Sequence, residues 1–151
     1  MADICRQKTS SDYSCHSNQD SYISEILRIL ENEIGDQRAE ILIGNIEGMV
    51  STALSCCYIY RATHPNTKLI YLPISNNMPP WYKKFFDAVP YSSFGDITAE
   101  YAFNYRNNYI VDHCDVCITY IYENNGTLFD LYLRAKNSGK TIYNLYELQR
   151  K

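Results

Sequence analysis

The sequence contains no long apolar run and no block of basic residues, and each absence excludes a class of function. No stretch reaches the roughly 18 consecutive apolar residues expected of a membrane-spanning helix. Lys and Arg number 14 against 17 Asp and Glu, so the net charge of −3 does not favour a nucleic-acid partner. No apolar secretory segment opens the chain, which favours a cytoplasmic location.

Cysteine occurs six times, but without the pattern of a zinc site. Cys114 and Cys117 have the CxxC spacing of metal ligands, yet no second pair follows them. Cys56 and Cys57 lie in an apolar helical run, where free cysteine behaves as a small hydrophobic residue. The sequence therefore predicts buried free thiols in a reducing compartment and no bound metal.

What the sequence does contain is an alternation of short apolar strands with helical patterns. Buried strands are predicted at 39–44, 67–73, 115–122 and 140–145, and helices at 21–34, 45–65, 79–89, 97–114 and 127–139. This order predicts an α/β, three-layer, Rossmann-like fold with a mostly parallel central sheet of about five strands. One domain covers 21–151. Residues 1–20 are expected to be either a loose polar arm or a degenerate first strand, the latter as a short edge strand at 2–5.

Helical spacing predicts which side chains face the core. In the first helix the inward residues are Ile23, Ile26, Leu27, Leu30 and Ile34. In the helix at 97–114 the inward candidates are Ala102, Tyr105, Tyr109 and Ile110.

Two glycine turns follow predicted strands, at the edge of a parallel sheet where ligands usually bind. Gly44 and Gly48 in the first turn would let a ligand approach the backbone, or would simply allow a tight turn. Gly126 and Thr127 begin a helix, whose unpaired N–H groups suit an anion; the alternative is an ordinary cap with Thr127 as the capping residue. The neighbouring amides are further candidate ligand contacts: Asn45 and Asn125.

An Arg-Asn pair precedes the strand at 115–122. Arg106 can donate two parallel hydrogen bonds to a phosphate or carboxylate, and Asn107 can bond a ribose. The alternative for Arg106 is a surface ion pair with one of three acidic residues: Glu100, Asp112 or Asp115.

Five short motifs stand in order in the second half of the chain: Arg106-Asn107, "IVDHCD", Gly126-Thr127, Ala135-Lys136 and "GKTI". Their order and spacing resemble the YpsA-like branch of the SLOG superfamily. The similarity extends over about residues 22–145. It implies a Rossmann-like domain that binds nucleotides or nucleotide-derived ligands.

The resemblance also implies a catalytic alternative. A related branch, the Lonely Guy phosphoribohydrolases, cleaves the N-glycosidic bond of nucleoside monophosphates and carries an acid after its Gly-Thr turn. Asp130 stands at the matching position. The chain departs from the YpsA-like pattern in lacking a Gly-His-Arg strand end within 1–20 and in having Val50 in place of an Asp.

Three functions follow from these observations. The favoured one is binding of a nucleotide-like small molecule in a sensing or regulatory role, because no paired acid and base is evident. The second is N-glycosidic hydrolysis or transfer through Asp130 with Arg106. The third is a scaffold without a ligand that works through protein contacts, and a homo-oligomer is compatible with all three.

Overall fold

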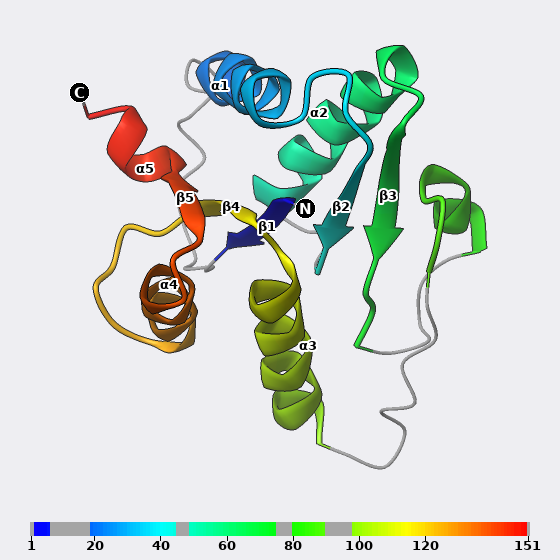
Figure 1. Ribbon diagram of the computed structural model, residues 1–151. Coiled ribbons are helices and arrows are strands. Elements are labelled where there is room, and N and C mark those ends of the chain that lie inside the picture. Colours follow the sequence, from blue (N-terminus) through cyan, green and yellow to red (C-terminus); the bar gives the residue numbers. More distant parts are fainter. Residues whose placement is uncertain (1, 7–18, 45–48, 75–79, 90–97, 151) are drawn as a thin grey trace.

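A computed structural model describes residues 2–6, 19–44, 49–74, 80–89 and 98–150. Strands and helices alternate along the chain (Figure 1). The elements in order are β1 (Ala2–Arg6), α1 (Gln19–Glu33), β2 (Ala39–Ile43), α2 (Met49–Thr63), β3 (Thr67–Tyr71), the 3₁₀ helix η1 (Pro80–Phe85), α3 (Ala99–His113), β4 (Val116–Tyr120), α4 (Thr127–Asn137), β5 (Thr141–Asn144) and α5 (Leu145–Leu148). The predicted α/β class with parallel strands is confirmed.

The strands are short and pair in the order β3-β2-β1-β4-β5, with every neighbouring pair parallel. β1 therefore lies between β2 and β4, and the expectation of an edge strand at 2–5 is wrong. It pairs along its whole length with β4, from Ala2 opposite Val116 to Arg6 opposite Tyr120. Its pairing with β2 spans only two residue pairs. Hydropathy gives only a weak strand signal for β1, because Ile4 is its only branched aliphatic residue.

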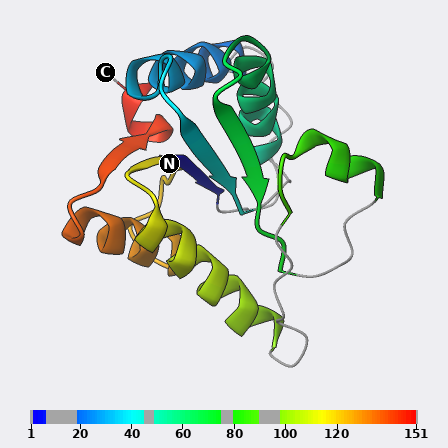
Figure 2. The same ribbon diagram turned by 45° about the vertical axis from the view of Figure 1, so that its right-hand side comes forward.

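Helices cover both faces of the strands: Figures 1 and 2 show α1 and α2 on one side and α3 and α4 on the other. The predicted inward face of α1 is confirmed, since Ile26, Leu30 and Ile34 are buried and the other two predicted residues pack against the same cluster. A second, smaller apolar cluster joins α3, α4 and β4. The buried free thiols expected at positions 56 and 57 are also confirmed.

The inward face of α3 differs from the prediction. Ala102 and Ile110 are buried as expected, but Tyr105 and Tyr109 are 58% and 42% exposed. Their places toward the core are taken by the Arg106-Asn107 pair. The reason is that two polar residues lie on the buried side of this helix, so apolar spacing alone assigns its orientation incorrectly.

Two further elements differ from expectation. The helix predicted at 79–89 is a single 3₁₀ segment, and Asp87 after it accepts hydrogen bonds from the Leu69 backbone N–H at 2.8 Å and from Arg61 at 2.6 Å. A short terminal helix, α5, was not predicted; the Asn144 side chain caps its first turn by accepting from the Tyr146 N–H. Residues 91–96, whose sequence is compatible with a short strand or a loop, lie outside the described residues.

α3 and α4 are joined by a two-point ion pair on their exposed side. Arg134 donates from Nε and from a terminal nitrogen to the two carboxylate oxygens of Asp112, both at 2.8 Å. These hydrogen bonds lower the pKa of Asp112 below its ordinary value. Asp112 therefore pairs with an arginine from the neighbouring helix.

A carboxyl whose pKa is lowered by folding contributes stability above its unfolded pKa and loses it as the pH falls through the folded pKa. We therefore expect Asp112→Asn to destabilise the protein slightly at pH 6 and to have no effect at pH values below the folded pKa. Urea unfolding of both proteins across this range measures the difference. A difference that stays constant between pH 6 and strong acid would contradict the ion pair.

Candidate functional site

Gly44, the residue that follows β2, is in direct contact with α3. A Cβ atom placed on Gly44 would lie 2.8 Å from Cδ1 of Ile110 and 3.2 Å from Nε of Arg106. Real Cβ atoms essentially never approach another heavy atom to 2.8 Å, so a side chain at position 44 would force Ile110 to shift. The room that it provides is occupied by the protein's own guanidinium group and by an isoleucine side chain.

The guanidinium group beside Gly44 is buried and held in a fixed orientation. Arg106 is 5% exposed and Asn107 is 1% exposed. Arg106 donates from Nε at 3.0 Å and from a terminal nitrogen at 2.9 Å to the same oxygen, Oδ1 of Asn107. Its Cζ also lies 5.0 Å from the centre of the Phe103 ring, a cation–π distance. The structure thus brings three of the predicted site residues together.

Because Oδ1 of Asn107 faces the guanidinium group, its Nδ2 faces elsewhere, and this nitrogen is buried without a hydrogen-bond partner. A buried donor that is left unpaired costs about 1–3 kcal/mol. Native proteins keep few such groups, and each one calls for a physical explanation. Nδ2 of Asn107 is therefore the atom at this site that is most in need of an acceptor.

Thr119 on β4 is a second buried polar residue, and the sequence analysis missed it. Its Oγ1 has no hydrogen-bond partner, and the residue is 7% exposed. With Val111 and Leu128 it lines a cavity of about 20 Å³ between α3, α4 and β4. This space is sufficient for one water molecule. Threonine is common in strands, so the sequence carried no signal for this position.

The turn before α4 has the backbone geometry of an open helix N-terminus. Gly126 is the N-cap with φ of 83°, and no side chain caps the helix there. The capping role considered for Thr127 is thus wrong, since Thr127 is the first helical residue. Asn125, Gly126 and Thr127 are exposed, which leaves the first N–H groups of the helix facing solvent. Asp130 is also exposed and lies in the first turn, where a carboxylate complements the helix dipole.

The remaining candidates are not all gathered with Arg106. Asn45 and Gly48 lie outside the described residues. An ion pair between Asp112 and Arg134 joins α3 and α4 near their C-terminal ends, whereas Arg106 lies in the middle of α3 and Gly126 precedes α4. Gly44, Arg106 and Asn107 are therefore the part of the predicted site whose contacts are defined.

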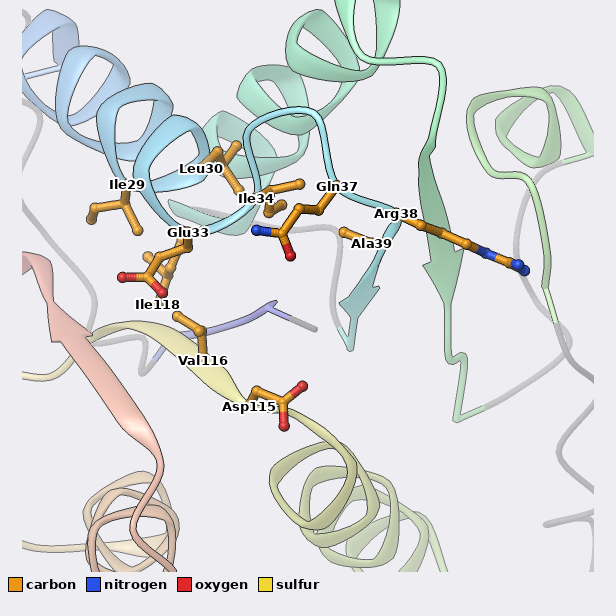
Figure 3. Close-up of a pocket in the computed structure, with 10 residues that line it drawn as sticks. All are labelled: Ile29, Leu30, Glu33, Ile34, Gln37, Arg38, Ala39, Asp115, Val116 and Ile118. Carbon is orange, nitrogen blue, oxygen red and sulfur yellow. The ribbon is translucent and has the colours of Figure 1, made fainter.

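A separate pocket of about 260 Å³ lies at the opposite edge, beside the amino ends of β2 and β4. Figure 3 shows Glu33 and Gln37 on one side of it and Asp115 on the other, while the Arg38 side chain extends away. Glu33 accepts a hydrogen bond from the hydroxyl of Tyr143, and this bond raises the pKa of Tyr143. None of the predicted ligand-binding residues lines this pocket.

No protein-family model matches the chain, and no curated protein matches it. The described part of the chain contains no helix that is long and apolar enough to cross a membrane. Among those same residues, no group of three or more His, Cys, Asp or Glu side chains is placed to hold a metal ion. The relation to the SLOG superfamily remains a prediction from the motifs.

Gly44→Ala tests the contact between β2 and α3. The added methyl group would overlap Cδ1 of Ile110, so we expect the variant to be less stable by about 1–3 kcal/mol. Ile110→Val removes that Cδ1 atom, and we expect it to recover part of the loss in the double variant although it destabilises on its own. Chemical denaturation of the four proteins measures this coupling. Additive effects of the two substitutions would contradict the close contact.

Proposed function

We propose that the protein binds an anionic, nucleotide-like small molecule beside Gly44, Arg106 and Asn107, at the carboxyl edge of a Rossmann-like sheet. The observation that carries the proposal is the buried Nδ2 of Asn107, which lacks an acceptor next to a buried guanidinium group. A ligand oxygen would satisfy this donor and would be attracted by the positive charge.

The position of these residues follows from the topology. α3 leads into β4, so the chain runs along α3 toward the amino end of that strand and its earlier residues lie toward the carboxyl edge. Gly44 follows the last residue of β2, and its contact with Arg106 supports the same placement. In open parallel sheets this edge is where small ligands bind.

The chemistry of the donors supports a ligand group that only accepts hydrogen bonds. Arg106 has donors and no acceptor, and the one acceptor of Asn107 already faces it. Phosphate and carboxylate oxygens fit this requirement, whereas an amine or guanidinium ligand does not. Together with the motifs that resemble the SLOG superfamily, this makes a phosphate-bearing nucleotide the favoured ligand.

Binding, rather than turnover, is the function that these contacts support. Asp130 is exposed in the first turn of α4, where the helix dipole alone accounts for a carboxylate. The hydrolase alternative requires this residue to reach a sugar together with Arg106. Release of base from nucleoside monophosphates, lost in Asp130→Asn, is the result that would favour that alternative.

The test measures the thermal unfolding temperature of the protein in the presence of inorganic phosphate, mononucleotides, dinucleotides or cyclic nucleotides. A ligand at about 100 times its Kd adds about 2.7 kcal/mol, a rise of roughly 5–10 °C for a domain of this size. We expect Arg106→Ala and Asn107→Asp to abolish the rise. Asn107→Asp is the sharper variant, because it replaces the unpaired donor with an oxygen and places a carboxylate beside the guanidinium group.

Arg134→Ala is the matched control, since it removes an arginine from the neighbouring helix whose partner is Asp112. We expect this control to keep the full ligand-induced rise. No rise with any ligand of the panel would contradict the proposal and favour the scaffold alternative. A rise that survives Asn107→Asp would place the ligand elsewhere.

A further inference from the structure

Two buried cysteines stand in contact at the junction of α3 and β4. The sulfur atoms of Cys114 and Cys117 lie 3.1 Å apart, closer than two sulfurs that merely touch. Cys114 is the C-cap of α3, where its backbone N–H donates to the Ile110 carbonyl, and Cys117 is the second residue of β4. Neither cysteine is part of a disulfide in the structure, and their exposed fractions are 0% and 3%.

Contacts within α3 and within the sheet fix the positions of Cys114 and Cys117, respectively. Cys114 also directs its thiol at the carbonyl of Val111, in the last turn of α3. Cys117 pairs in the sheet with residues of β1 and β5, and the Asp115 carbonyl between the two cysteines accepts from the Thr141 N–H at 3.1 Å. A disulfide requires a separation near 2.05 Å, so a movement of roughly 1 Å would be enough.

We propose that Cys114 and Cys117 form an internal disulfide when the protein meets a small peroxide. The inference is independent of the proposed ligand site. It rests on the contact between the sulfurs and on the cavity of about 20 Å³ that Cys117 lines, which is sized for a water-like molecule. A bulky oxidant such as glutathione disulfide has no comparable access to two buried thiols.

The chemistry is a two-electron oxidation of the dithiol. The thiolate of Cys117 attacks one peroxide oxygen, which forms an S–O bond, breaks the O–O bond and releases the other oxygen as water after protonation. The sulfur of Cys114 then attacks the resulting sulfenic acid. The S–S bond forms, the S–O bond breaks and a second water leaves with the Cys114 proton. Two thiols and one hydrogen peroxide thus give one disulfide and two waters.

The chain contains an internal control in α2. Cys56 and Cys57 are adjacent in a helix, so their side chains point in different directions and cannot join without distorting the backbone. Burial raises the pKa of Cys56 to about 11, and it raises the pKa of Cys57 as well. Cys114 and Cys117 are equally buried, so the difference lies in geometry: Cys56 and Cys57 are expected to stay reduced because their sulfurs cannot meet, while the Cys114–Cys117 pair oxidises.

The test is mass spectrometry of the folded full-length chain after treatment with hydrogen peroxide. The protein is then unfolded with an alkylating reagent and cleaved with trypsin. We expect the peptide Asn107–Arg134 to lose two hydrogen atoms and take up no alkyl group, and Ala39–Arg61 to take up two. We also expect the oxidised protein to unfold several degrees higher, because the bridge restricts the unfolded chain. Glutathione disulfide in place of peroxide should leave both peptides alkylated.

Cys114→Ser and Cys117→Ser keep the size of each side chain and remove one sulfur. Peroxide should then leave the remaining cysteine of the pair as a thiol or an oxygen adduct, with no bridge. The wild-type measurement needs no variant, so a folding defect in either variant does not affect the test. Double alkylation of Asn107–Arg134 after peroxide treatment, or oxygen added to Cys117 with Cys114 still alkylated, would overturn the proposal.

Discussion

The structure depends on how closely α3 approaches the end of β2. Because Gly44 has no side chain, Ile110 and the guanidinium group of Arg106 pack directly against the backbone at the end of β2. The approach buries a permanent positive charge, which is costly unless hydrogen bonds compensate for it. Asn107 supplies part of that compensation through Oδ1, and its own Nδ2 is left without an acceptor. Packing, burial and the unpaired donor are thus consequences of one contact.

The two ends of the strands differ in the charged groups found there. Arg106, a buried cation, lies beside the end of β2, whereas the pocket at the amino edge is lined by the carboxylates of Glu33 and Asp115 together with Arg38. α3 connects this chemistry to the cysteine pair, because Arg106 lies in its middle and Cys114 caps its end.

Much of the fold could be predicted from the sequence, because apolar residues form short continuous runs in the strands and recur at helical spacing in the amphipathic helices. The inward face of α1 and the buried cysteines of α2 followed from spacing alone. β1 was assigned to an edge because its sequence, ADICR, contains a single branched aliphatic residue and lacks the apolar run typical of a central parallel strand. The predicted inward face of α3 was wrong because its buried side carries Arg106 and Asn107. A prediction from hydrophobic spacing assigns polar residues to the exposed side of a helix. That failure coincides with the candidate site, where local rules are most often broken.

The most direct measurement of the central claim is the NMR signal of the side-chain nitrogens at the site during titration with phosphate and adenosine monophosphate. We expect the signals of Nε of Arg106 and Nδ2 of Asn107 to shift together. Unchanged signals for these groups, with shifts instead at Gln37 and Ala39 beside the amino-edge pocket, would contradict it.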